Sequence, residues 1–463
     1  MRSFTRFGVA VSAVVAAMAW TAASSGIAGS FPDSTADVGE ASASDLVAQA
    51  GPPPNPKKPP ADAGKPELAP AAPQPPVSPP QAEKSPPSPP SESEAQPPAS
   101  PSPDLLASLA GERLAAAPNM FGDSYFSHDA HLVFSESSTY TGHGTYVNAA
   151  LPLVGADRSC KLAEDGNTLP QDRMYFLYNH FDHALDLCAQ GVGSGGSQLQ
   201  RGLDLDRYTL GFEKMLGERW SVEFRMPFFG TVDFQDPQLP VLAFQNQNVG
   251  NLAIIGKRLL YSSESSAISA GLGICTPTGG DFCASVLGGD LAVNNNAVHL
   301  LPFAAMLWTP TCRTFVQAFL QVDTPTNCDA ASYVNSVTQI RGQGQYKEQS
   351  LLYADLECGY WLYCNCHARV LTGLASVIEF HYTAPLDGSN GVVLSSSSSA
   401  NPGAPDIQLV NPADCAGVVN MTLGLHAELA GNTLLRAGGC FPLSSVDSRF
   451  FDAEVQVQLE RRF

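Results

Sequence analysis

Apolar and polar residues alternate along residues 451–463, at the C-terminal end of the chain. Val457 and Leu459 fall on one face, whereas Glu460 falls on the other, and Phe463 closes the run. A period of two residues is that of a β-strand whose two faces meet different surroundings. The stretch therefore predicts a long amphipathic strand that ends on an aromatic residue.

The same alternation recurs in pairs of runs that are joined by short turns. The predicted hairpins pair residues 208–214 with 220–228, 251–260 with 266–274, 297–308 with 313–322, 351–363 with 367–382, and 418–429 with 433–441. Long polar connections separate them, over residues 182–202, 230–249, 276–296, 323–350 and 384–417. Strict sorting into short and long connections is typical of transmembrane barrels, which have tight periplasmic turns and long outer loops. A sandwich or a propeller is not expected to sort its loops in this way.

The predicted fold class is all-β, an antiparallel transmembrane β-barrel. Residues 173–181, with less regular runs at 131–135 and 145–154, add to the hairpins and the final strand. The total is about 14 strands, within a range of about 12 to 16, and an even number is expected. The C-terminus is expected on the periplasmic side, with the short turns. A soluble antiparallel sheet with one buried face is the competing interpretation.

The charged face of each strand is expected to point into the lumen, because a charge that faces hydrocarbon at the membrane midplane costs about 2–4 kcal/mol. Acidic groups outnumber basic ones among these positions, which predicts mild cation selectivity if the pore is open. Alternatively, they form a salt-bridged interior without a pore. The predicted lumen and selectivity residues are Glu213, Glu223, Arg225, Asp355, Glu357, Arg369, Glu379, His381, Arg436, Glu454 and Glu460.

The N-terminal region divides into two predicted segments ahead of the barrel, which is assigned to residues 105–463. Residues 1–28 combine early arginines, a short apolar run and small residues, as in a secretory signal peptide. Residues 29–104 form a linker, and the stretch 52–103 holds 21 of the chain's 37 prolines. Such a composition predicts disorder or polyproline II. The linker is either an inert tether in the periplasm or a spacer that reaches the cell wall.

Residues 105–170 are less regular and fit either an additional hairpin, which the pattern weakly favours, or a plug that enters the lumen. No apolar run is long enough for a helical membrane span, and residues 297–308 come nearest. The net charge of -19 argues against nucleic-acid binding. Ordinary solubility explains this charge better than loops that hold divalent cations do.

The 11 cysteines of an exported chain predict disulfides. Candidate pairs are Cys312 with Cys364 or Cys366, and Cys275 with Cys283.

Sequence motifs of enzymes, including the phosphate loop, the zinc-protease helix and the serine nucleophile elbow, do not occur. The chain is therefore predicted to be neither an enzyme nor a cofactor protein. One loop carries a mixed set of nitrogen, oxygen and sulfur groups, but strand-end residues in water explain it better than a metal site does. These residues are His180, Asp182, His183, Asp186, Cys188, Asp204 and Asp206. The tip sequence Cys364-Asn365-Cys366-His367 is likewise better explained by disulfides than by metal.

With its sorted loops and a closing strand that ends on Phe463, the chain resembles bacterial outer-membrane β-barrel channels and transporters. The phrase from Lys161 through Pro170 and Arg173 to Asn179 is similar to planctomycete outer-membrane proteins that carry a proline-rich leader. The resemblance implies an outer-membrane location and passive transport.

The leading functional hypothesis is a channel for diffusion of small solutes. The alternatives are a plugged barrel for uptake of hydrophobic solutes, and a structural or adhesive barrel that links the outer membrane to the cell wall. The expected partners are outer-membrane lipids and small solutes. A homo-oligomer is possible.

Overall fold

The computed structural model describes residues 114, 117–123, 131–137, 144–150, 160–192, 197–231, 233–245, 248–365, 367–388, 390–396, 405–410, 417–430, 432–444 and 449–463. The predicted signal peptide and linker lie outside these residues. Within the described ranges, no helix is long and apolar enough to cross a membrane.

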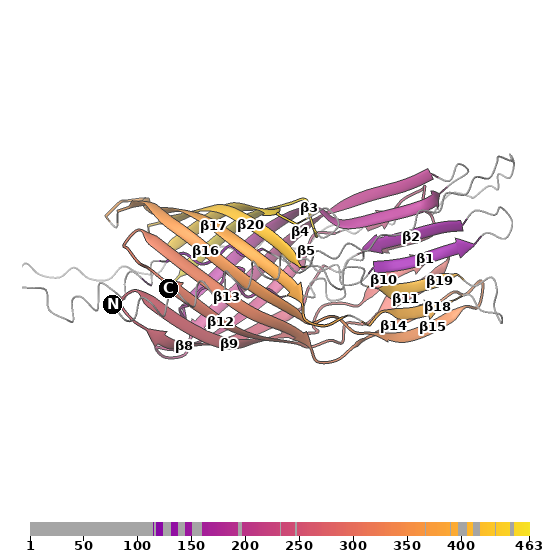
Figure 1. Ribbon diagram of the computed structural model, residues 1–463, viewed down its shortest axis with the longest axis horizontal. Coiled ribbons are helices and arrows are strands. Elements are labelled where there is room, and N and C mark those ends of the chain that lie inside the picture. The colour runs from indigo at the N-terminus through magenta and orange to yellow at the C-terminus, as the bar shows by residue number, and fades with distance from the viewer. Residues whose placement is uncertain are drawn as a thin grey trace, which may run out of the picture. The chain divides into compact units, whose positions relative to one another are not determined.

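Long antiparallel strands form a closed barrel (Figure 1). Around the ring the order is β3-β22-β21-β20-β17-β16-β13-β12-β9-β8-β5-β4, and pairing of β4 with β3 closes it. The described barrel strands are β3 (Arg173–Val192), β4 (Ser197–Met215), β5 (Trp220–Phe229), β8 (Leu252–Ser262), β9 (Ser266–Thr276), β12 (His299–Trp308), β13 (Thr314–Pro325), β16 (Leu351–Cys364), β17 (Leu371–Pro385), β20 (Val418–Leu429), β21 (Thr433–Pro442) and β22 (Ala453–Arg462). All five predicted hairpins are confirmed, as are the strand at 173–181 and the C-terminal strand.

The wall of the barrel is apolar outside and charged inside. Leu210 and Leu425 each expose 52% of their surface on the outer face, whereas Glu213, Glu379 and Glu454 are fully buried on the inner face. This is the reverse of a water-soluble sandwich, in which apolar side chains fill the interior. An outer wall of this kind fits hydrocarbon as its solvent, because strands of such barrels alternate apolar-out and polar-in.

Short turns join the strands at one end of the barrel, and the C-terminus lies at the same end. Phe463 donates its backbone N–H to the carbonyl of Asp172 at 3.1 Å, and Arg462 donates to Asn432 in the neighbouring turn. Two of these turns need a left-handed residue, which Gly217 supplies at φ +81° and Asn432 at φ 61°. The sequence-predicted sorting of the turns is therefore present.

The predicted long polar loops are not irregular. The described part of 182–202 belongs to the ends of β3 and β4 themselves, and the other four contain short strands of their own. They are β6 (Asp233–Gln235), β7 (Leu242–Gln245), β10 (Phe282–Val286), β11 (Gly289–Val293), β14 (Asp329–Val334), β15 (Arg341–Tyr346), β18 (Val392–Ser395) and β19 (Asp406–Val410). The hairpins β6–β7, β10–β11 and β14–β15 build a six-stranded sheet. The labelled short strands gather beyond the end of the barrel opposite to the short turns (Figure 1).

The predicted count of about 14 barrel strands is not confirmed, because two of the predicted strands lie outside the closed ring. These are β1 (His131–Ser137) and β2 (Gly144–Ala150). They pair with each other, and β2 pairs with residues 187–190 of β3, past the point where the ring closes. The described ring has twelve strands, at the lower end of the predicted range.

A large apolar core lies between the short strands and the adjoining ends of the long ones. It includes Phe134, Phe244, Phe282 and Tyr333, together with Phe451 from the segment before β22. Phe244 lies between Phe234 and Phe282, with ring centroids 5.3 and 6.2 Å away. Alternation in these strands of three to seven residues buries one face of each, so the loops form a folded layer rather than free loops.

None of the nine described cysteines is in a disulfide. The predicted pairs Cys312–Cys364 and Cys275–Cys283 are therefore not formed. Cys275 is buried on the inner face of β9, while Cys283 is exposed on β10 in the six-stranded sheet. Cys366 lies outside the described residues.

Candidate functional site

Two segments of the chain fill the inside of the barrel: residues 117–123 and 160–171, which together we call the plug. Nearly all of their side chains are buried, and Met120, Phe121 and Asp165 are completely enclosed. The segments bind each other, since Met120 donates its N–H to the carbonyl of Gly166 at 2.9 Å and Asn167 Nδ2 lies 2.8 Å from Asn119 Oδ1. Residues 105–170 were expected to form either a plug or an additional hairpin. The described residues include both, since these two segments form the plug and β1 pairs with β2 as a hairpin.

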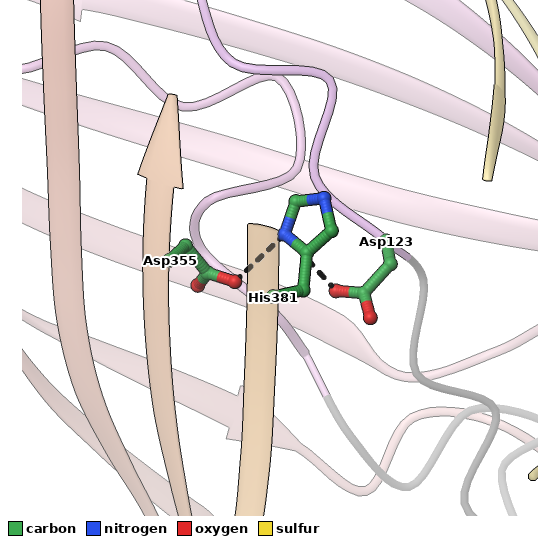
Figure 2. A group of neighbouring side chains, drawn as sticks. All are labelled: Asp123, Asp355 and His381. Atoms are coloured by element: carbon green, nitrogen blue, oxygen red, sulfur yellow. Dashed lines mark hydrogen bonds and ion pairs between the residues drawn. The ribbon is translucent and has the colours of Figure 1, made fainter. Parts of the chain in front are cut away.

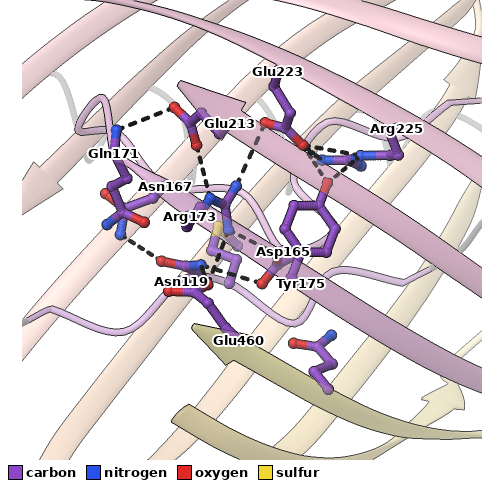
Figure 3. Close-up of polar contacts among 12 residues, drawn as sticks. Asn119, Asp165, Asn167, Gln171, Arg173, Tyr175, Glu213, Glu223, Arg225 and Glu460 are labelled. Atoms are coloured by element: carbon purple, nitrogen blue, oxygen red, sulfur yellow. Dashed lines mark hydrogen bonds and ion pairs between the residues drawn. The ribbon is translucent and has the colours of Figure 1, made fainter. Parts of the chain in front are cut away.

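Arg173, the first residue of β3, is the centre of the ion-pair network that anchors the plug (Figure 3). Its guanidinium is fully buried, and it lies 2.7 Å from Asp165 of the plug. The same group reaches Glu213 at 2.8 Å, Glu460 at 3.1 Å and Glu223 at 3.5 Å on the surrounding strands. One cation thus joins the plug to β4, β5 and β22.

Two further arginines of the wall hold the plug. Arg436 of β21 forms an ion pair with Asp165 and donates to the backbone carbonyls of Asn119 at 2.7 Å and Met120 at 3.1 Å. Arg207 of β4 forms an ion pair with Glu164. Because both partners are buried in each case, losing one would leave a charge without compensation.

A second charged cluster joins both plug segments to β16 and β17. Lys161 forms ion pairs with Asp123 and, at 2.7 Å, with Asp355. His381 lies 2.8 Å from Asp355 through Nδ1 and 3.0 Å from the hydroxyl of Thr422 through Nε2. Figure 2 shows Asp123, Asp355 and His381 turned toward one another. These three could form a metal-ligand set, but the ammonium group of Lys161 already supplies the cation between the two carboxylates, so the set does not fit a metal.

Side chains of the wall also satisfy the plug's backbone, which has no sheet or helix partners of its own. Glu379 accepts the N–H groups of Phe121 at 2.6 Å and Gly122 at 2.8 Å, one on each carboxylate oxygen. Gln321 accepts from Leu162 N and donates to the carbonyl of Cys160, both at 2.7 Å. The wall therefore recognises the backbone of the plug as well as its charges.

Asp172 follows the last residue of the plug and lies outside the barrel strands, beside the β4–β5 turn. The Asp172 carboxylate accepts the backbone N–H of Met215 at 2.7 Å, and Lys214 lies 2.9 Å away. These two hydrogen bonds lower the pKa of Asp172. The charge at this position ties the end of the plug to the wall.

Ten of the predicted lumen residues have buried side chains on the inner face. They are Glu213, Glu223, Arg225, Asp355, Glu357, Glu379, His381, Arg436, Glu454 and Glu460. The prediction was wrong for Arg369, which is exposed, because β17 begins at Leu371 and residues 367–370 belong to the turn. A role for the ten in ion selectivity stays a prediction.

Several residues that complete these networks were not among the predicted lumen residues. Lys161 and Asp165 lie in the irregular region 105–170, and Arg173 begins the strand that follows it. A plug is one interpretation of that region, but the sequence does not indicate which side chains would hold it. Asp123 stands in a stretch with no regular period, so no signal marked it. Lys257, which lies 2.9 Å from Glu213, interrupts the apolar run of β8 on its inward parity.

The loop residues considered for metal binding are partly brought together by a bulge in β3. Asp182, His183 and Asp204 place ligand atoms within 4.8 Å of one another, and His183 adopts φ 51°. Hydrogen bonds among them account for the contact, since His183 donates its N–H to Asp204 at 3.0 Å and its ring lies 3.1 Å from Asp182. His180 pairs separately with Asp206 at 2.8 Å. That no metal binds stays a prediction.

No protein-family model matches the sequence, and no curated protein matches it. Solved structures do resemble the fold. The COG4313 outer membrane channel from Pseudomonas putida F1 is 14% identical, covering 64% of this chain and 96% of that one, with a TM-score of 0.40. The Pseudomonas putida toluene transporter TodX is 9% identical over 74% and 98%, with a TM-score of 0.37, and the NanC porin is 5% identical over 63% and 98%, with a TM-score of 0.32. Resemblances at these scores carry no functional argument for this chain.

Proposed function

We propose that this protein is a plugged outer-membrane channel for the uptake of small hydrophobic solutes. The observation that carries the proposal is the plug: residues 117–123 and 160–171 fill the lumen through contacts that are all non-covalent. A solute can cross only when part of this plug moves. None of these contacts is covalent, so part of the plug can move without breaking a bond.

The hydrophobic character of the solute is inferred from the short-strand layer. The interior of this layer is an apolar core with many aromatic side chains, among them Phe244, Phe282 and Tyr346. A water-filled entrance would instead be lined by polar groups, as in porins. Free diffusion of hydrophilic solutes through an open lumen, the leading hypothesis from the sequence, is less well supported, because the plug occupies that space.

The location and the N-terminal segments belong to the same proposal. The apolar outer wall suits outer-membrane lipids, and residues 1–28 would direct export. Residues 29–104 would then lie in the periplasm, within reach of the cell wall. The resemblance to planctomycete proteins with a proline-rich leader, and the homo-oligomer, stay predictions.

Uptake by whole cells tests the proposal. Cells with an intact lipopolysaccharide layer would express either the protein or an empty vector, and uptake of [14C]naphthalene and [14C]sucrose would be compared. We expect faster entry of naphthalene and unchanged entry of sucrose. Faster entry of sucrose would support an open pore instead, and no change for either probe would support a structural or adhesive barrel.

A further inference from the structure

Two neighbouring strands of the barrel, β9 and β12, contain no Asp, Glu, Lys or Arg. Their inward residues pair in register, for example Gly273 with Leu301 and Ser269 with Ala305. Apart from His299 at one end, this inner face is uncharged, and we call the remainder the apolar lane; it consists of Ala267, Ser269, Gly271, Gly273, Cys275, Leu301, Phe303, Ala305 and Leu307. In the ring it lies opposite β21 and β22, which carry Arg436, Glu454 and Glu460.

The plug meets these two sides of the lumen in different ways. Toward the apolar lane it presents Met120 and Leu162, which pack in one cluster with Leu301 and Phe303. A Cβ atom on Gly273 would lie 3.5 Å from Leu162 Cδ1, so the plug touches the wall closely here. Toward the opposite side it forms the buried ion pairs, which cannot be separated without leaving charges unpaired. The plug can therefore leave the lane more easily than it can leave the charged wall.

Unfilled space and an unpartnered polar atom lie along this side of the plug. Two cavities of about 10 Å³ each reach the edge of the lane, one at Phe303 and one at Cys275, and their other walls include charged residues such as Glu213 and Arg207. The hydroxyl of Ser269, fully buried in the lane, has no hydrogen-bond partner among the described residues.

We infer that the apolar lane is the path along which an uncharged hydrophobic solute crosses the barrel, between β9–β12 and residues 160–167 of the plug. The ion pairs of Lys161, Glu164 and Asp165 with the wall keep the plug backbone in place during passage, so that only side chains facing the lane move. A hydrophobic solute replaces Leu162 and Met120 against the lane, so apolar surface stays out of water. On β9 and β12 a charged solute meets only His299, which is already paired with Asp323 and Glu348, and is therefore excluded. This inference rests on the proposed function and specifies its route.

A matched pair of substitutions on one strand tests the route. Ala305→Phe fills the lane, whereas Ala304→Phe adds the same bulk on the exposed outer face of β12. Both variants would be checked for heat-modifiable migration and assayed for [14C]naphthalene uptake. We expect Ala305→Phe to slow uptake on the order of tenfold and Ala304→Phe to leave it unchanged. If Ala305→Phe does not fold, Ser269→Leu replaces it, with Ala270→Leu as its control.

The outcomes separate the route from the function. Wild-type uptake with equal rates in Ala305→Phe and Ala304→Phe would overturn the lane and leave the proposed function standing. No wild-type uptake above the empty vector would overturn both.

Discussion

Replacing Arg173 by Met should release the plug from three barrel strands at once. The side chain is fully buried, and its guanidinium lies within 2.7–3.5 Å of four carboxylates, those of Asp165, Glu213, Glu460 and Glu223. Methionine has similar length but no charge, so the substitution removes the cation with little change in volume. Buried carboxylates without a partner are strongly unfavourable.

The size of the effect follows from the other cations nearby. Each of the four carboxylates keeps a second partner. Lys257 lies 2.9 Å from Glu213, Arg462 lies 2.6 Å from Glu460 and Arg225 lies 2.8 Å from Glu223, while Arg436 pairs with Asp165. The loss is therefore that of one broken buried pair rather than four, about 3–5 kcal/mol in the free energy of unfolding. A change of this size lowers the folded-to-unfolded ratio by a factor of about 10² to 10³ or more.

Urea unfolding in detergent, followed by heat-modifiable migration, measures this change. Arg369→Met is the matched control, because Arg369 lies exposed in the turn before β17 and should change stability by no more than about 0.5 kcal/mol. If Arg173→Met costs less than about 1 kcal/mol, as an exposed ion pair would, or no more than the control, the reasoning that the plug is seated by buried charge is refuted.

Three further predictions concern the plug and the outer loops. Gly122→Ala should lower the free energy of unfolding clearly more than Gly217→Ala, measured in urea. Each puts alanine at a positive φ, which costs about 1–2 kcal/mol, but only at Gly122 would the added Cβ clash, 2.5 Å from Glu164 Cα, whereas Gly217 faces open space. Equal losses of stability would contradict the close packing of the plug. Glu379→Gln should lower the free energy of unfolding by about 1–3 kcal/mol, since one of two buried backbone N–H groups of the plug loses its acceptor. Unchanged stability would contradict this contact between the wall and the plug. Burial raises the pKa of Asp387, but hydrogen bonds from Ser350 and the charge of Lys347 outweigh it, so the pKa is lowered. The stabilisation from this carboxylate is present above the ordinary aspartate pKa and is lost as pH falls through the lowered value. Asp387→Asn should therefore be less stable than wild type at about pH 7 but not at about pH 2, and a difference that persists in acid would contradict these contacts.

The barrel could be predicted because its strands alternate over their whole length. In β5 and β22 every second residue meets lipid and the others meet the lumen, and this periodicity is visible without knowing any partner. The same rule placed Glu213, Glu379 and Glu460 on the inner face. It was wrong at Arg369, because local alternation continues through a turn residue that no longer belongs to the strand.

A plug is one of the two interpretations that the sequence allows for residues 105–170, but which residues enter the lumen could not be predicted, because they follow no period. Asp123, Lys161 and Asp165 are held by contacts to residues more than 190 positions away, such as Lys161 with Asp355 and Asp165 with Arg436. The short outer strands were not predicted for a related reason: β10 and β11 have only five residues each. Alternation over so few positions is not distinguishable from loop composition.

Single-channel conductance of the wild-type protein in a planar bilayer tests the central claim that the plug closes the lumen. The measurement would use protein whose folding has been established by heat-modifiable migration, with Arg173→Met as the comparison. We expect no long-lived conductance steps for the folded wild type and frequent openings for the variant. Stable, cation-preferring steps from the wild type would show an open lumen and contradict the account.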